Sequence, residues 1–233
     1  GQPISEEFAD FLFNWDEGNP FFTEELLGSM AANGQLQWHE PTWQVSMGIR
    51  PHLPSSLTAA ILDRFVRLPT IDQEVLAYAA VIGRVFDFPL LAALSKLDER
   101  ELVEVLRRAI NAQLISEVSN TQPVKTAAGE QERYQFRHAL TREAIYDQML
   151  APERRLRHRK VAEQLEQALA ERAADTIALS TRGFDNVTRL LAEHYWLAGL
   201  PEKALPYALQ EAERARRIFA LREERYYLNM AQA

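Results

Sequence analysis

Apolar residues recur along most of this chain every three to four positions, the spacing of one face of an amphipathic helix. Ser5, followed by Glu6 and Glu7, favours a helix start, because serine accepts a first-turn hydrogen bond and acids there complement the helix dipole. Pro20 suits the first turn of a second helix, where its missing N–H does no harm. The pattern predicts helices over residues 5–16, 20–34, 56–68, 71–83, 88–95, 98–113, 138–149, 153–172, 187–198 and 201–217, and one from about 218.

Short alternating segments predict strands between some of these helices. Two of them, at 36–38 and 43–45, read as a hairpin, and two more, at 114–118 and 134–137, flank a polar tip at 119–132. Helices followed by a two-stranded wing have the order of a winged-helix domain. The expected fold class is therefore mainly α, with a helical module, a winged-helix domain with a small β-wing, and helical hairpins after it.

The period of the pattern changes from two to about 3.6 at His138, where a strand gives way to a helix. A side chain at such a joint lies beside the first unpaired N–H groups of the helix, where an anion is favoured. Histidine there can donate a hydrogen bond to phosphate and can change charge near neutral pH. The residues alone also allow a histidine that only caps or packs the joint.

Four segments of the sequence resemble the signal-transduction ATPases with numerous domains, the group that contains the maltose-regulator-type transcription factors and the NLR receptors. These segments read GNPFFTEELL, LPSSLTAAILDRFVRLP, EVLAYAAVIGRVF and FRHALTREAIYD. The receptors carry Met-His-Asp and then leucine, so His138 and Leu140 match while Ala139 replaces the acid. The resemblance implies that His138 reads the β-phosphate of bound ADP and that Pro20, in the Gly-x-Pro module, lies against the adenine. Ordinary loop chemistry would also give Gly-Asn-Pro.

The last part of the chain is similar to a tetratricopeptide (TPR) repeat in the spacing of Leu191, Ala192, Tyr195, Gly199 and Ala204. About one repeat fits, and one repeat cannot bury its own face, so the array is expected to continue beyond the chain. The resemblance implies that these helices receive a protein or small-molecule inducer. The expected units are residues 1–50 (end of the ATPase helical module), 51–150 (winged helix), 151–186 (linking helix and connector) and 187–233 (TPR-like helices).

Composition narrows the classes further. The 233 residues are 47% hydrophobic and 25% charged, as in ordinary globular proteins, and the net charge of −7 argues against a general nucleic-acid or membrane surface. No cysteine is present, which fits a cytoplasmic protein and excludes thiolate chemistry. The chain also opens without Met, directly into a helix start, which suggests a piece of a longer protein.

Catalytic motifs are absent from the sequence. It contains no Gly-x-x-x-x-Gly-Lys-Ser/Thr phosphate loop, no Gly-x-Ser-x-Gly and no His-Glu-x-x-His. The remaining histidines, His39, His52, His158 and His194, show no metal-ligand spacing. We therefore expect no enzyme activity, metal or cofactor in this chain alone, and expect ADP or ATP to bind only together with a phosphate-loop domain of the full-length protein.

Two alternatives remain open at this stage. The first is a DNA-binding winged-helix regulator with a helical dimerisation tail, whose recognition helix would be 98–113 with Arg100, Arg107 and Arg108. Residues 54–150, however, carry 11 Lys/Arg and 13 Asp/Glu, a net charge of 11 − 13 = −2, which disfavours phosphate contacts. The second is a scaffold module that binds only protein. The basic run at 154–160 is expected to be a solvated helix face rather than a nucleic-acid patch.

Overall fold

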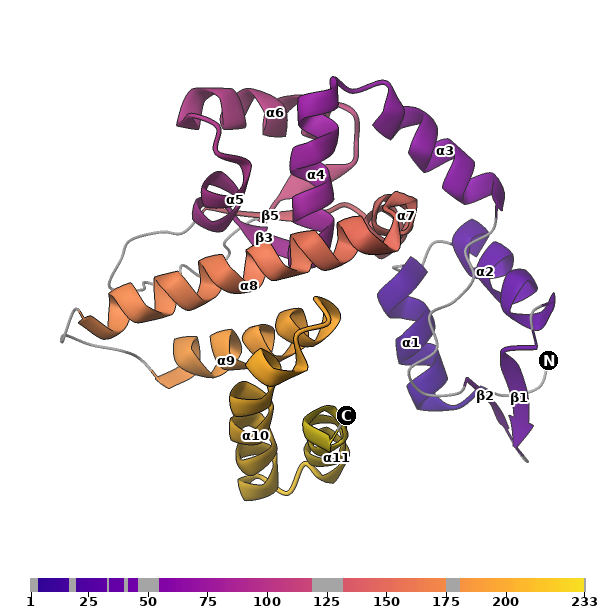
Figure 1. Cartoon of the computed structure of the whole chain (residues 1–233). Helices are drawn as coiled ribbons and strands as arrows, with labels where there is room; N and C mark the ends of the chain where they lie inside the picture. Colours follow the sequence, from indigo (N-terminus) through magenta and orange to yellow (C-terminus); the bar gives the residue numbers. More distant parts are fainter. Residues whose placement is uncertain are drawn as a thin grey trace.

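The computed structural model describes residues 4–16, 20–32, 34–39, 42–45, 55–118, 132–174 and 181–232. Over these residues the protein is mainly helical, with two small antiparallel sheets (Figure 1). The predicted boundary between residues 50 and 51 lies outside the described residues, as does the polar tip at 119–132 except for its last residue.

The N-terminal module consists of α1 (Glu6–Asp16), α2 (Pro20–Ala32) and the antiparallel hairpin β1 (Leu36–His39) and β2 (Thr42–Val45). The Ser5 hydroxyl accepts a hydrogen bond from the Phe8 amide at 3.2 Å, which confirms the predicted cap. A small core joins the two helices, formed by Phe8, Leu12, Leu26 and Met30. The module touches the rest of the protein where α1 packs against α7.

The central unit runs from residue 55 to residue 148. Its elements are α3 (Ser55–Val66), α4 (Thr70–Ile82), β3 (Val85–Asp87), α5 (Phe88–Ser95), α6 (Glu99–Asn111), β4 (Ile115–Glu117), β5 (Arg133–Phe136) and α7 (Ala139–Gln148). The strands form one antiparallel sheet in the order β3-β5-β4. Phe86 lies opposite Tyr134, and Ile115 lies opposite Phe136.

The third strand of this sheet corrects the prediction of a two-stranded wing. β3 is only three residues long, too short for alternation to reveal it, and it forms because β5 supplies its hydrogen-bonding partner. The helix start at α6 was predicted well. Asp98 accepts from the Glu101 amide at 2.9 Å, and the Glu101 carboxylate accepts from the Asp98 amide at 3.3 Å, which completes a capping box.

A buried carboxylate joins α4 to α6. Asp72 is fully buried, and its two oxygens accept from the Nε and one terminal nitrogen of Arg108 at 2.6 and 2.8 Å. Such a two-point contact fixes the orientation of both side chains as well as neutralising the acid. The pairing fixes how α6 lies on α4.

The C-terminal part consists of α8 (Ala151–Ala174), α9 (Thr181–Leu197), α10 (Pro201–Arg217) and α11 (Leu221–Gln232). The predicted polar connector at 173–186 is wrong in its second half, because α9 already begins at residue 181. The last helix begins at Leu221 rather than at Ile218, since Phe219 takes a left-handed φ of 59° that ends the preceding helix.

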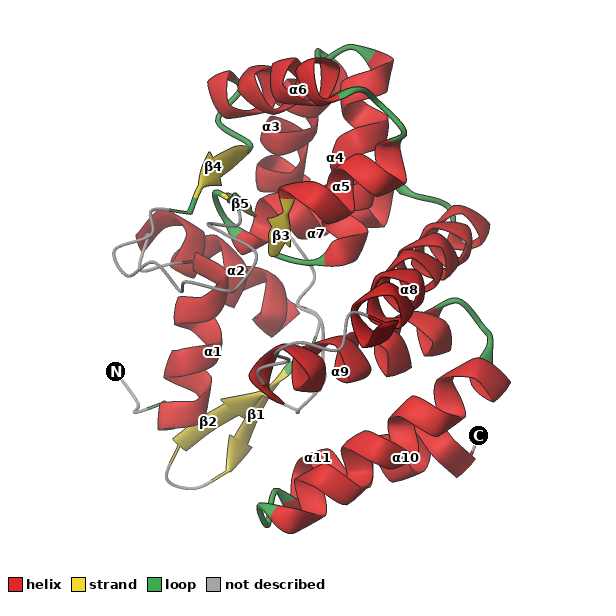
Figure 2. Ribbon diagram, turned by 90° about the vertical axis from the view of Figure 1, so that its left-hand side faces the viewer, coloured by secondary structure: helices red, strands yellow, loops and turns green. Residues whose placement is uncertain are grey.

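One continuous core runs through the central unit and into the C-terminal helices. It includes Phe86 and Phe136 of the sheet, Val161 of α8, Tyr195 of α9 and Ala204 of α10. Helix α8 lies between the α4–α7 helices and the C-terminal helices (Figure 2). A smaller cluster then joins α9, α10 and α11 through Ala192, Ala208, Ala212, Tyr227 and Met230.

Candidate functional site

His138 lies at the joint that the sequence predicted. It is the residue before α7, with extended backbone angles (φ −133°, ψ 147°), and its carbonyl accepts from the Thr141 amide at 3.0 Å. Its half-buried side chain makes no capping hydrogen bond to α7. His138 is thus the residue at the N-terminus of α7, although its side chain does not cap that helix.

Pro20 is the first residue of α2, as predicted. Its side chain, together with Gly18 and Asn19, lies outside the described part of the structure. The structure connects the segments that contain Pro20 and His138 through two helices. Helix α1, which belongs to the same module as Pro20, packs against α7, which begins just after His138 (Figure 1).

Arg142, in the first turn of α7, joins this helix to α4 by a hydrogen bond. Its Nε donates to the Ala80 carbonyl at 2.8 Å, and a terminal nitrogen lies 3.3 Å from the Glu143 carboxylate. The guanidinium also lies 5.4 Å from the centre of the Tyr146 ring, within the range of a cation–π contact. The first turn of α7 is thus joined to α4 by a charged group.

A buried chain of three polar side chains continues from α7 to α9. The Tyr146 hydroxyl lies 2.8 Å from Nε2 of His158 in α8, and Nδ1 of His158 lies 2.8 Å from Nδ1 of His194 in α9. All three residues are less than 5% exposed. The sequence reading, which treated His158 and His194 as scattered, missed this contact because it joins positions 36 apart on different helices.

Burial affects the charge of His194, the last of these three side chains. Burial first, and then the neighbouring His158, Arg142 and Arg189, together lower the pKa of His194 to about 3. A histidine with so low a pKa is neutral at physiological pH. His194 therefore takes part in the contact with His158 as a neutral imidazole.

Glu166 of α8 makes a second polar contact with the C-terminal helices. Its carboxylate accepts from the hydroxyls of Tyr195 and Tyr207 at 2.6 and 2.7 Å. These two hydrogen bonds lower the pKa of Glu166, and burial followed by the bond to Glu166 raises the pKa of Tyr207 to about 12. The carboxylate is thus held in its ionised form between α9 and α10.

The basic run on α8 has mixed roles. Arg159 pairs with Glu163 of the same helix at 2.7 Å on the exposed face, as expected of a solvated helix face. Arg157 and Lys160 lie 5.4 and 5.8 Å from the centre of the Tyr78 ring in α4, and Lys160 donates to the Tyr78 hydroxyl at 3.1 Å. Part of the run therefore attaches α8 to the central unit, which a purely solvated face would not do.

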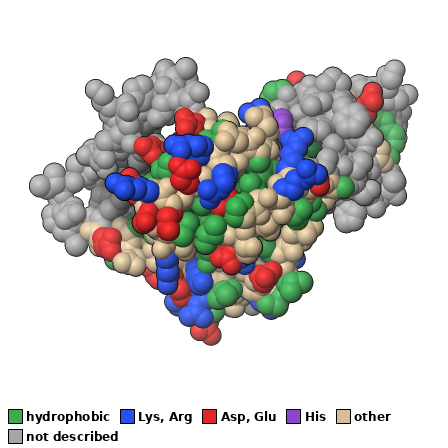
Figure 3. All heavy atoms as spheres, turned by 90° about the horizontal axis from the view of Figure 1, so that it is seen from above, with side chains coloured by type: hydrophobic (Ala, Val, Ile, Leu, Met, Phe, Trp, Pro, Cys, Tyr) green, Lys and Arg blue, Asp and Glu red, His purple; other side chains and the backbone are tan. Residues whose placement is uncertain are grey.

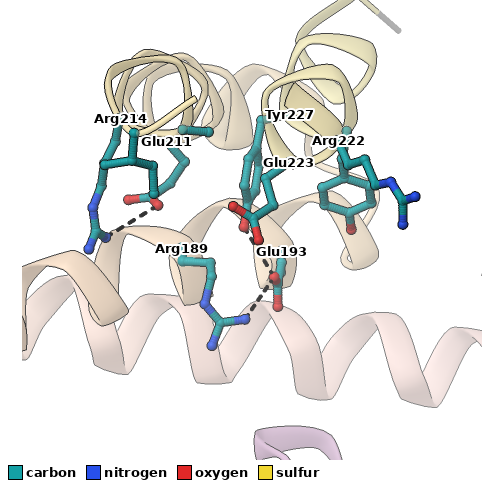
Figure 4. Close-up of a pocket in the computed structure, with 10 residues that line it drawn as sticks. Arg189, Glu193, Glu211, Arg214, Arg222, Glu223 and Tyr227 are labelled. Carbon is teal, nitrogen blue, oxygen red and sulfur yellow. Dashed lines mark hydrogen bonds and ion pairs between the residues drawn. The ribbon is translucent and has the colours of Figure 1, made fainter. Parts of the chain in front are cut away.

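A concave site of about 590 Å³ lies among α9, α10 and α11 (Figure 4). At its base Arg189 pairs with Glu193 at 3.1 Å, and the Tyr227 hydroxyl donates to Glu193 at 3.4 Å. On one side Arg214 lies 3.6 Å from Glu211. Because acids and bases alternate around this hollow, it is suited to a ligand that carries both donors and acceptors rather than to a highly charged one.

Two negative findings apply to the described residues. No group of three His, Cys, Asp or Glu side chains there is placed to hold a metal ion. None of the helices described is both long enough and apolar enough to cross a bilayer.

The chain is similar to a longer protein from a bacterium. No family model matches the chain. An uncharacterized protein of Rhizobium meliloti (strain 1021) is 28% identical over 216 residues, which are 92% of this chain and 19% of that protein. The chain thus spans about a fifth of the length of this relative.

Proposed function

We propose that this chain is the regulatory segment of a nucleotide-switch signalling ATPase of the kind that the sequence resembles, and that it couples the ADP or ATP state of a phosphate-loop domain to a helical sensor. The observation that carries the proposal is the position of α7. This helix begins just after His138 and packs against α1. Its Tyr146 contacts His158 of α8, which in turn contacts His194 of α9. A change at the nucleotide would thus have a packed route to the C-terminal helices.

The order of elements supports this proposal. The sequence α4-β3-α5-α6-β4-β5, with the three strands in one antiparallel sheet, is the order of a winged-helix domain. Of the five positions that resemble a TPR repeat, Leu191, Ala192, Tyr195 and Ala204 are buried, whereas Gly199 is exposed. The hollow among α9, α10 and α11 is the proposed place for a protein or small-molecule inducer.

The DNA-binding alternative receives no support from the described face of α6. Arg108 is engaged by the buried Asp72, and Arg107 pairs with Glu104 on its own helix. The exposed positions of α6 carry two arginines and three glutamates, counted as Arg100, Arg107, Glu99, Glu101 and Glu104. Positive and negative side chains are interspersed on the face viewed in Figure 3. Duplex DNA needs a basic face instead.

Under this proposal the chain supplies sensing groups and the phosphate-loop domain supplies catalysis. His138 would donate to the β-phosphate of ADP, and Pro20 would pack on the adenine. A charge-assisted hydrogen bond of this kind contributes about 1.5–3 kcal/mol, roughly a tenfold to hundredfold shift in a two-state equilibrium. A complete switch needs about 10⁴-fold, so packing of the modules against each other must supply the remainder.

Replacing His138 by alanine in the parent protein tests the proposal. We expect ADP affinity to fall roughly tenfold to a hundredfold while ATP affinity changes little, because only the closed, ADP-bound arrangement would bring His138 onto the phosphate. Calorimetric titration with each nucleotide measures both values. Arg137→Ala, an exposed neighbour, is the matched control and should leave both affinities unchanged. Equal changes for ADP and ATP would leave His138 a packing residue.

A further inference from the structure

The contact between His158 and His194 has an unusual chemical requirement. Two Nδ1 atoms 2.8 Å apart can share one hydrogen bond only if one carries a proton and the other offers a lone pair. With both rings neutral this is satisfied in two ways, since the Tyr146 hydroxyl can either donate to His158 Nε2 or accept from it. The contact is therefore complete in the neutral state and needs no further proton.

An additional proton on either ring would have to enter a buried environment. The charged groups around the pair come from all three helices that meet there, and they form ion pairs: Arg142 with Glu143 and Arg154 with Asp147 around α7, and Arg189 with Glu193 on α9. Tyr146 is a further titratable group at the pair, through its contact with His158. A positive charge on either imidazole would have to be buried with its partner ring already in hydrogen-bond contact.

We propose that the His158–His194 pair is a proton-sensitive latch. It holds α9 on α8 while both rings are neutral, and it releases α9, together with α10 and α11, when the pair takes up a proton. The latch concerns this chain alone and does not depend on nucleotide binding. Its failure would therefore leave the proposed nucleotide sensing untouched.

The direction of the pH effect follows from where the proton binds. In a released helix His194 has its ordinary pKa of 6.5, whereas burial holds it near 3 when α9 is attached. Between these values the released form binds more protons, so attachment is fully stable above pH 6.5 and weakens as the pH falls. For one proton the equilibrium shifts toward release by about 25-fold between pH 7 and pH 5.

The contact of Glu166 with Tyr195 and Tyr207 depends on pH over a lower pH range than the histidine pair does. The pKa of Glu166 lies below the ordinary value of 4.5 because Tyr195 and Tyr207 donate to it. A carboxylate with a lowered pKa contributes its full stability above the ordinary pKa and loses it only at lower pH. Between pH 7 and pH 5 the Glu166 contact is therefore constant, and the two contacts can be separated by experiment.

Hydrogen exchange on the chain tests the latch. We expect the protection factors of α9 amides, corrected for intrinsic exchange, to fall about 25-fold from pH 7 to pH 5, while α4 amides keep theirs. In His194→Asn, which cannot titrate, the α9 values should be the same at both pH values. Glu166→Gln is the matched control: it should lower α9 protection at both pH values and retain the 25-fold difference.

Two results would overturn the proposal. One is α9 protection in the wild-type chain that does not change between pH 7 and pH 5. The other is a fall of the same size in His194→Asn, which would place the titrating group elsewhere. Should that variant fail to fold, NMR titration of the wild-type ring decides instead: a His194 signal that titrates near pH 6.5 while α9 stays protected contradicts the latch, and titration together with loss of α9 protection supports it.

Discussion

Replacing Phe86 with alanine should lower the free energy of unfolding by about 3–5 kcal/mol. Phe86 is 1% exposed, at the centre of the short strand β3. Its ring lies 5.6 Å from that of Phe136 and 6.2 Å from that of Tyr134, measured between centroids. The substitution removes the apolar contacts of a large side chain and leaves a cavity that its neighbours on β5 cannot fill.

Urea denaturation followed by circular dichroism measures this effect. Val85→Ala is the matched control, because Val85 is the next residue on the same strand and is 36% exposed. It should lower stability by less than about 1 kcal/mol. Equal losses for the two variants would mean that β3 is not packed into the core as described.

Replacing Tyr195 with alanine should also lower stability by about 3–5 kcal/mol, chiefly by weakening the attachment of α9 and α10. Tyr195 is fully buried, and its ring stacks on that of Tyr207 with a centroid distance of 6.2 Å. Its hydroxyl donates to Glu166 at 2.6 Å. The variant loses both the buried ring and one of the two donors that hold the Glu166 carboxylate.

Two further variants separate these contributions. Tyr195→Phe keeps the ring and removes only the hydrogen bond, so it should lower stability by about 1–2 kcal/mol. Tyr226→Ala removes a ring that is 52% exposed and should change stability by less than about 1 kcal/mol. If Tyr195→Ala were no worse than Tyr226→Ala in thermal or urea denaturation, the shared core of α8 and α9 would be contradicted.

Much of the secondary structure could be predicted because its signals are local. Helix α5 has the predicted bounds, from Phe88 to Ser95, and α6 starts just after Asp98, the first residue of the predicted helix. His138 likewise lies at the predicted joint, because a change of period is visible within a few residues. Each of these features depends on residues that are neighbours in sequence.

What the sequence did not predict depends on contacts between distant positions. Asp72 with Arg108, and His158 with His194, are both 36 residues apart, and no periodicity links them. β3 exists because β5 pairs with it across a long separation. The contacts of Lys160 and Arg157 with Tyr78 likewise join α8 to α4, two helices that are far apart in sequence. The positive charge of these two side chains does not by itself indicate that they contact Tyr78.

The most direct test of the proposed coupling is hydrogen exchange of the α9 amides in the parent protein, compared between ADP and a non-hydrolysable ATP analogue. If α7 transmits the nucleotide state, α9 protection should be higher with ADP than with the analogue, and His138→Ala should remove most of that difference. Equal α9 protection with both nucleotides in the wild-type protein, or an unchanged difference in His138→Ala, would contradict the coupling.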